Sequence, residues 1–150
     1  MIRNARHSDT QELVDFVQKY HQEKSNLSDI PFDRGSMVAY IDYHIGTPKH
    51  VVYINENASG ITGFILGGLE PFPHNKKQYW ASDGMFIADQ GGASLLKRFH
   101  AWAFASGAKR IFQGVSTGDG RADLLYSAMK NMKRTGGMYV VYKESNKESI

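Results

Sequence analysis

The sequence predicts an α+β domain in which helices cover both faces of one mixed β-sheet. Its 150 residues suit a single domain, which we expect to span residues 1–150. Segments with strand-type and helix-type patterning follow the order β, α, α, β, β, β, α, β, α, β. Short turns join the early strands, so these should be antiparallel, whereas the later strands alternate with helices and should run parallel.

The first third of the chain predicts a short strand and two helices. The strand spans 2–6, and Ser8 or Asp9 caps the helix that follows, with Glu12 placed to return the capping-box bond. That helix has apolar residues at helical spacing: Leu13, Phe16, Val17 and Tyr20. A second helix begins after Asp33, its expected N-cap, and ends at the Gly-Thr-Pro run that follows residue 45.

The rest of the chain predicts a hairpin, a long strand and two strand–helix units. Strands are expected at 50–55, 61–69, 78–87, 109–115 and 138–143. Helices are expected from the Gly-rich step near residue 92 to Gly107, and from Arg121 to about Arg134 with Leu124 and Leu125 inward. Residues 144–150 are polar and should be frayed.

Composition excludes several classes of function. The chain has no cysteine, which excludes disulfides, thiolate catalysis and Cys-based metal sites. No pair of its six histidines has the spacing of a metal site. No apolar run is long enough for a membrane helix, and the N-terminus is too polar for a signal peptide, so we expect a cytoplasmic protein of the producing or host cell. The net charge of +3 is spread along the chain, which does not favour nucleic-acid binding.

One stretch resembles a known family. It runs from Ala81-Ser82-Asp83 through Gly91-Gly92, Leu95-Leu96-Lys97, Trp102-Ala103 and Gly107-Ala108-Lys109 to Gly114-Val115-Ser116-Thr117-Gly118, followed by Leu125-Tyr126. In this order the segments are similar to the GNAT superfamily of N-acetyltransferases, in particular to a subgroup common in phages and proteobacteria. The resemblance covers nearly the whole chain and implies transfer of an acetyl group from acetyl-CoA to a primary amine by direct attack.

The resemblance also implies where coenzyme A is held. The segment Gln90-Gly91-Gly92-Ala93-Ser94 stands where the family binds the pyrophosphate, and a helix N-terminus with glycines suits that anion. The interval from the strand to the leucine pair is about five residues shorter than in the family. A backbone N–H near Met85, Phe86 or Ile87 would polarise the thioester carbonyl, and Gly84 could accommodate a β-bulge there.

Proton transfer requires an acid and a base. Tyr126 matches the family's usual general acid, although a helical tyrosine beside two leucines also suits a core. Asp83 is the first candidate for the base and Glu70 the second, while Asp83 might equally pair with a lysine. The family often has an asparagine shortly before the tyrosine, and the segment Gly118-Asp119-Gly120-Arg121 has none.

Two functions follow. The first is an N-acetyltransferase whose amine acceptor, a small molecule or a protein, meets a cleft lined by Tyr40, Tyr43 and Glu70. The alternative is a GNAT-fold protein that has lost coenzyme A and acts as a binding or structural component, for instance in a phage virion. A homodimer or larger assembly is also an expectation, with contacts through Phe72, Tyr79 and Trp80.

Overall fold

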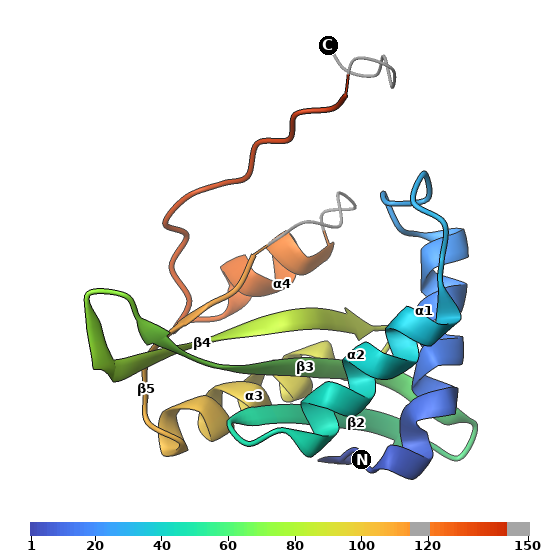
Figure 1. Cartoon of the computed structure of the whole chain (residues 1–150), viewed down its shortest axis with the longest axis horizontal. Helices are drawn as coiled ribbons and strands as arrows, with labels where there is room; N and C mark the ends of the chain where they lie inside the picture. Colours follow the sequence, from blue (N-terminus) through green and yellow to red (C-terminus); the bar gives the residue numbers. More distant parts are fainter. Residues whose placement is uncertain (115–120, 144–150) are drawn as a thin grey trace. The chain divides into compact units, whose positions relative to one another are not determined.

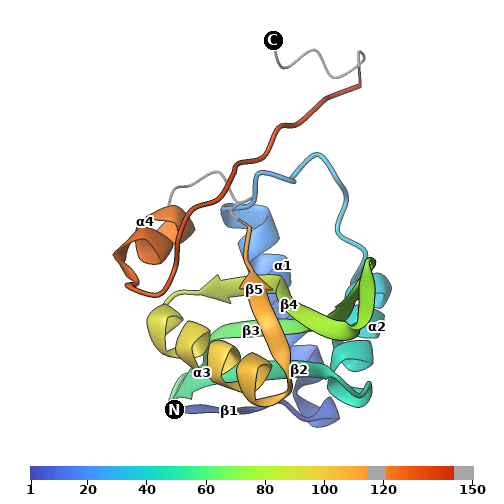
Figure 2. The ribbon, with the colours of Figure 1, turned by 90° about the vertical axis from the view of Figure 1, so that its left-hand side faces the viewer.

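The computed structural model describes residues 1–114 and 121–143, and the chain divides into two compact units, Met1–Gln113 and Gly114–Ile150. The first unit is built around a five-stranded sheet (Figures 1 and 2). Its strands are β1 (Ile2–Asn4), β2 (His50–Asn57), β3 (Gly60–Phe72), β4 (Asn75–Ala88) and β5 (Ala108–Phe112). They lie side by side in chain order; the first four are antiparallel to their neighbours, and β5 runs parallel to β4.

Helices cover both faces of this sheet, as the sequence predicts (Figure 1). A short 3-10 helix, η1 (His7–Asp9), precedes α1 (Thr10–Glu23), and α2 (Arg34–Gly46) follows a loop. Both α-helices pack on one face of the sheet, whereas α3 (Gly92–Ala105) packs on the other. The crossover through α3 makes β5 parallel to β4, because a strand that follows a helical crossover returns in the same direction.

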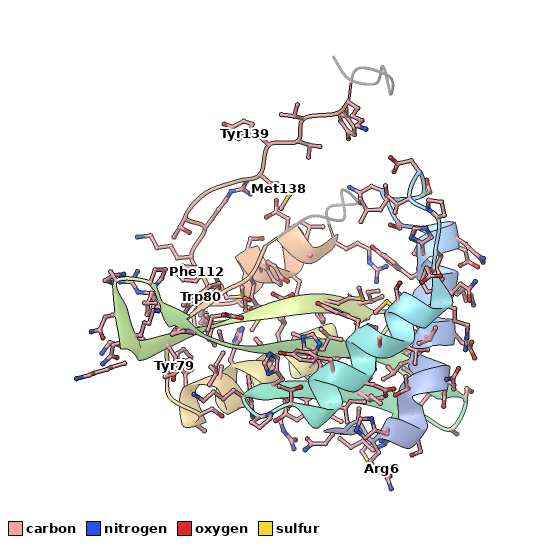
Figure 3. The ribbon with its side chains drawn as sticks, viewed as in Figure 1. Arg6, Tyr79, Trp80, Phe112, Met138 and Tyr139 are labelled. Carbon is pink, nitrogen blue, oxygen red and sulfur yellow. The ribbon has the colours of Figure 1, made fainter. Side chains whose placement is uncertain are left out.

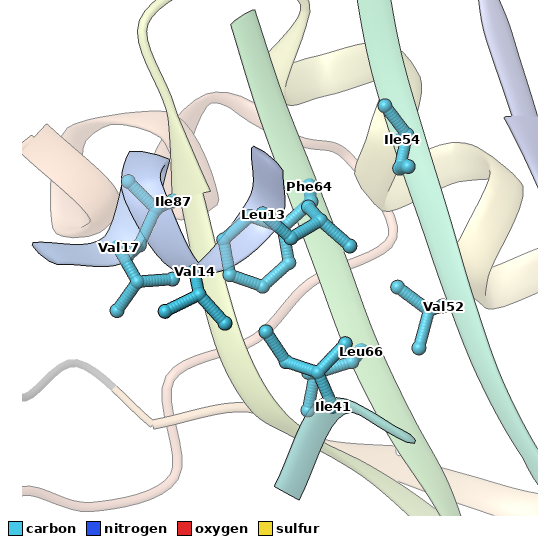
Figure 4. Packing of buried hydrophobic residues seen from close by; sticks show 9 residues of the cluster. All are labelled: Leu13, Val14, Val17, Ile41, Val52, Ile54, Phe64, Leu66 and Ile87. Atoms are coloured by element: carbon cyan, nitrogen blue, oxygen red, sulfur yellow. The ribbon is translucent and has the colours of Figure 1, made fainter. Parts of the chain in front are cut away.

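The main hydrophobic core lies between α1, α2 and the central strands (Figure 4). Its nine buried members are Leu13, Val14, Val17, Ile41, Val52, Ile54, Phe64, Leu66 and Ile87. The helix members recur at helical spacing and the strand members alternate along β2 and β3, so each element contributes one apolar face.

The helix starts confirm one sequence prediction and correct another. Asp33 is the N-cap of α2, and its carboxylate accepts the backbone N–H of Ser36 at 3.0 Å. Asp9 instead accepts the N–H of Arg6 and forms a bidentate pair with Arg3, at 2.8 and 2.9 Å. The capping-box role expected of Glu12 was wrong, because its carboxylate accepts the backbone N–H of Ile61 at the start of β3.

The second unit departs further from the prediction. Its helix α4 spans Arg121–Ala128 rather than reaching Arg134, and Leu124, expected inward, is 74% exposed. Residues 138–143 form no strand, and Tyr139 is 99% exposed. Apolar β-branched and aromatic residues favour a strand, yet a strand also needs a hydrogen-bonding neighbour, which pattern alone does not supply. The expected frayed tail, 144–150, lies outside the described residues, and the single domain expected from length stays a prediction.

The residues that the structure describes contain no helix that combines the length and the apolar character required to cross a bilayer. Their His, Asp and Glu side chains form no group of three that could hold a metal ion.

Candidate functional site

The candidate site lies where β4 and β5 separate. The parallel ladder between them begins at Tyr79 and ends where Ser82 faces Phe112. At the last part of this ladder, the ring of Trp80 packs edge-on against Phe112 with 5.5 Å between centroids (Figure 3). Beyond Ser82, β4 continues to Ala88 and stays paired with β3 alone among the strands of the first unit. The two strands therefore form a fork, and the edge of β4 inside it pairs with no other strand of the first unit.

A β-bulge stands at the start of this fork. Leu66 of β3 faces Met85, but the next residue, Gly67, faces Asp83, so Gly84 is the extra residue on β4. The structure thus shows the bulge that the sequence suggested at Gly84. Antiparallel pairing directs alternate N–H groups of β4 away from β3, so at least one amide among residues 85–87 points toward the fork.

The bulge turns neighbouring residues toward opposite faces of the sheet. A Cβ on Gly67 would lie 2.8 Å from the ring of Phe99, so this position and its partner Asp83 are on the α3 side. A Cβ on Gly84 would overlap the hydroxyl of Tyr40, which comes from α2 on the other side. Glycine at position 84 therefore lets the Tyr40 hydroxyl approach the backbone next to Asp83.

Asp83 is the most strongly perturbed carboxyl group at this site. Burial raises its pKa from 3.8 to about 6, while its own backbone N–H and the side chain of Gln113 favour the charged form and oppose that shift. The pKa of Tyr40 is raised as well, first by burial and then by the charge of Asp83. A carboxyl group with a pKa near 6 is charged at neutral pH and able to accept a proton.

Aromatic side chains extend from Tyr40 along the same side of the sheet. The ring of His44 lies 4.6 Å from that of Tyr40 and 5.2 Å from that of His50. Tyr43 packs on both histidines and remains 55% exposed. Burial lowers the pKa of His44, which keeps this imidazole neutral at physiological pH. The group offers two tyrosine side chains to a ligand.

A three-residue turn joins β4 to α3. The amides of Asp89 and Gln90 both donate to the carbonyl oxygen of Thr62, at 2.8 and 3.3 Å. Gly91 follows with φ of +77°, and the amide of Asn55 donates to the carbonyl oxygen of Gln90 at 3.2 Å. A Cβ on Gly91 would overlap this Asn55 amide, so both the backbone conformation and the space require glycine.

The N-terminus of α3 is the part of this turn that suits an anion. Gly91 is the N-cap, and no side chain among the described residues caps the helix. The amides of Gly92, Ala93 and Ser94 are the first three of the helix and have no intrahelical acceptor, and Ala93 and Ser94 are exposed. Free amides at a helix N-terminus fit the pyrophosphate of a coenzyme such as coenzyme A.

The structure brings some of the predicted site residues together and separates others. Asp83, Tyr40 and residues 85–87 surround the fork. Glu70 is exposed and faces Trp80, three positions along β3 from the partner of Asp83, so it lies outside this cluster. Tyr126 belongs to α4 in the second unit, where it is 8% exposed, and its role as a proton donor stays a prediction.

The sequence did not single out two polar residues of the site, His100 and Gln113. His100 of α3 is 7% exposed, and its Nε2 lies 2.6 Å from Oε1 of Gln113. The position of His100 carried a signal, because it falls within the buried stripe formed by Leu96, Phe99 and Ala103. Gln113 carried none, since it lies within the strand expected at 109–115 and belongs to no motif, whereas β5 ends one residue before it.

Comparison with known proteins identifies the fold. An aminoglycoside acetyltransferase from an uncultured soil metagenomic sample, in complex with trehalose, superposes with a TM-score of 0.70 at 14% identity over 95% of each chain. A predicted acetyltransferase with acetyl-CoA from Clostridium acetobutylicum gives 0.71 at 16% identity over 99% of each chain. A ribosomal-protein-alanine N-acetyltransferase from Brucella melitensis biovar Abortus gives 0.67 at 11% identity, over 95% of this chain and 99% of the other.

Sequence comparisons add nothing to this result, since neither a family model nor a curated protein matches. Identities of 11–16% establish the fold alone. The chain therefore has the fold of GNAT acetyltransferases, an α+β architecture with a mixed five-stranded sheet whose β4 and β5 are parallel.

Proposed function

We propose that this protein is an acetyl-CoA-dependent N-acetyltransferase that moves an acetyl group to a primary amine by direct attack. The observation that carries the proposal is the fork between β4 and β5. It combines a bulge at Gly84, at least one backbone amide among residues 85–87 that points away from β3, and the partly buried carboxyl group of Asp83. The similarity to a structure solved with acetyl-CoA supports the same conclusion.

Coenzyme A would be held by two features of the chain. The amides of Gly92, Ala93 and Ser94 would bind the pyrophosphate, and the edge of β4 that faces the fork would receive the rest of the molecule. Residues Gln90 and Gly91 shape the turn through their backbones. When bound, acetyl-CoA would supply the activated acetyl group as a thioester.

The residues of the fork would then handle charge and protons. An amide among residues 85–87 would donate to the carbonyl oxygen as that oxygen gains negative charge. Asp83 would accept the proton that the amine nitrogen loses as this nitrogen bonds to the acetyl carbon. The bond from that carbon to sulfur breaks, and the thiolate takes up a proton, for which the resemblance implicates Tyr126.

The acceptor would be guided toward the fork by the aromatic surface on the α2 side of the sheet. Tyr40 lies next to Gly84 there, and Tyr43 continues the aromatic surface outward. Tyrosine faces attract organic cations, and the charge of Asp83 also reaches Tyr40 from the opposite face of β4. A protonated primary amine would therefore be attracted to this region before it gives up its proton.

One observation favours the alternative function. Thr62 engages the amides of Asp89 and Gln90, so only the amides from Gly91 onward remain for a pyrophosphate. Such a short turn offers few amides to a pyrophosphate. This favours a GNAT-fold protein that no longer binds coenzyme A and serves as a binding or structural component. The two functions differ in whether the purified protein consumes acetyl-CoA.

An assay for free thiol with acetyl-CoA and a panel of primary amines tests the proposal. We expect turnover with at least one amine, and Asp83→Asn should reduce kcat/KM by about a hundredfold or more, the usual contribution of a general base. Asp29→Asn, which changes an exposed acid in the loop before α2, should leave kcat/KM unchanged. An unaffected Asp83→Asn variant would contradict the role of Asp83.

A further inference from the structure

A polar chain runs from α3 to the fork through Gln113. His100 on α3 is buried, and its Nε2 lies 2.6 Å from Gln113 Oε1. An amide oxygen can only accept, so His100 Nε2 carries the proton and donates it. This bond fixes the orientation of the Gln113 amide and turns its Nε2 away from the imidazole.

The other end of the Gln113 amide is a buried donor. Gln113 Nε2 has no solvent access and meets no acceptor at normal hydrogen-bond distance in residues 1–114 and 121–143. Buried polar atoms are nearly always hydrogen-bonded, so a buried donor without an acceptor calls for a functional explanation. Gln113 directly follows β5 at the point where this strand leaves β4, so the amide lies inside the fork.

The group that the amide affects is Asp83. Gln113 stabilises the charged form of this carboxyl group and so partly offsets the effect of burial on its pKa. Asp83 and Gln113 directly follow Ser82 and Phe112, the last pair of the β4–β5 ladder. Both side chains lie on the α3 face of the sheet, since Asp83 faces Gly67 and Gln113 bonds to His100. Substrate binding, or a small shift of the fork, would bring the two groups into full contact.

We propose that Gln113 is a positioning residue that orients the Asp83 carboxylate for proton acceptance, and that His100 holds Gln113 in the required orientation. The inference rests on the proposed function of Asp83 as the base. Neither positioning residue needs to touch acetyl-CoA or the amine. Their effect is on the charge and direction of the one carboxyl group in the fork.

The surroundings of Asp83 leave this task to Gln113. From α2, on the opposite face of the sheet, the titratable group that interacts with Asp83 is Tyr40, whose raised pKa keeps it a neutral phenol at physiological pH. From α3 the facing group is His100, which reaches the site through Gln113. The remaining interaction that favours the carboxylate is the backbone N–H of Asp83 itself, which no side-chain substitution removes.

Carboxyl-carbon NMR of the full chain tests the inference without any ligand. With ¹³C-labelled aspartate, the pKa of Asp83 is measured in the wild type and in Gln113→Met, which keeps the length of the side chain and removes its amide. We expect the pKa of Asp83 to rise by about one unit. His100→Phe, which frees the amide to turn, should raise it in the same direction by less. Gln22→Met, on the exposed side of α1, is the matched control and should leave it unchanged.

The pH dependence of kcat/KM provides a second readout. In Gln113→Met the acidic limb should move to higher pH by the same amount as the NMR value, with little change in the KM for the amine. If the pKa of Asp83 in either folded variant, Gln113→Met or His100→Phe, equals the wild-type value, the inference is overturned. One folded variant is sufficient for this test. If the NMR shift appears but the wild type never consumes acetyl-CoA, the positioning of Asp83 stands and the proposed function fails.

Discussion

Asp83 should make the folded protein less stable at neutral pH than an uncharged residue would. Burial raises its pKa from 3.8 to about 6, so the folded state binds this proton more tightly than the unfolded state does. Between about pH 4 and pH 6 the stability therefore falls as pH rises, and the full loss is present above that window. A shift of about two units corresponds to on the order of 3 kcal/mol.

The substitution Asp83→Asn should recover most of this free energy. By urea denaturation, we expect the variant to be more stable than the wild type at pH 7.5 by roughly 2–3 kcal/mol, and nearly equal to it at pH 4. Asp29→Asn, an exposed control, should show little difference at either pH. If Asp83→Asn is less stable at pH 7.5, or if its advantage does not grow with pH, Asp83 is not the strained carboxyl described here.

Three other substitutions test separate parts of the structure by urea denaturation. Gly91→Ala should lose about 2–4 kcal/mol, because alanine is strained at φ of +77° and its Cβ would displace the Asn55 amide; stability within 0.5 kcal/mol of the wild type would mean that the turn is built differently. Gly35→Ala should gain about 0.5–1 kcal/mol, since it lies in α2 with its nearest neighbour 3.9 Å away, and a loss would place it outside an open helical position. Arg3 lowers the pKa of Asp9 through their hydrogen bonds, so Asp9→Asn should cost about 1 kcal/mol at pH 7 and progressively less as pH falls below 4; a cost independent of pH would show that charge is not involved.

Much of the first unit was predictable because its patterns are local. Continuous apolar runs mark β2 and β3, which are buried on both faces, and helical spacing in α1 and α3 marks one apolar face of each helix. Turn residues mark the hairpin between β2 and β3. Asp33 could be predicted as an N-cap because capping depends on neighbours within one turn. The partner of Glu12 could not, because it lies on β3, far away in the sequence.

Site residues could be predicted only where their position along a strand was sufficient to place them at the site. Asp83 and Gly84 were found because they lie on a strand whose place in the family fold is known, and the bulge occurs there. The pairing of Gln113 with His100 depends on how α3 lies over the end of β5, which no spacing rule encodes. Residues 138–143 show the opposite failure: their apolar pattern predicts a strand, but no strand of the described residues pairs with them.

The most direct test of the central claim is a calorimetric titration of the purified chain with acetyl-CoA. We predict saturable binding with a dissociation constant on the order of micromolar, weakened at least tenfold in Gly92→Glu, which sets a negative charge at the N-terminus of α3. The matched control Ala105→Glu, at the other end of the same helix, should bind as the wild type does. If a folded wild-type sample does not bind acetyl-CoA at millimolar concentration, the account is contradicted. The alternative, a binding or structural role for this protein, would then be favoured.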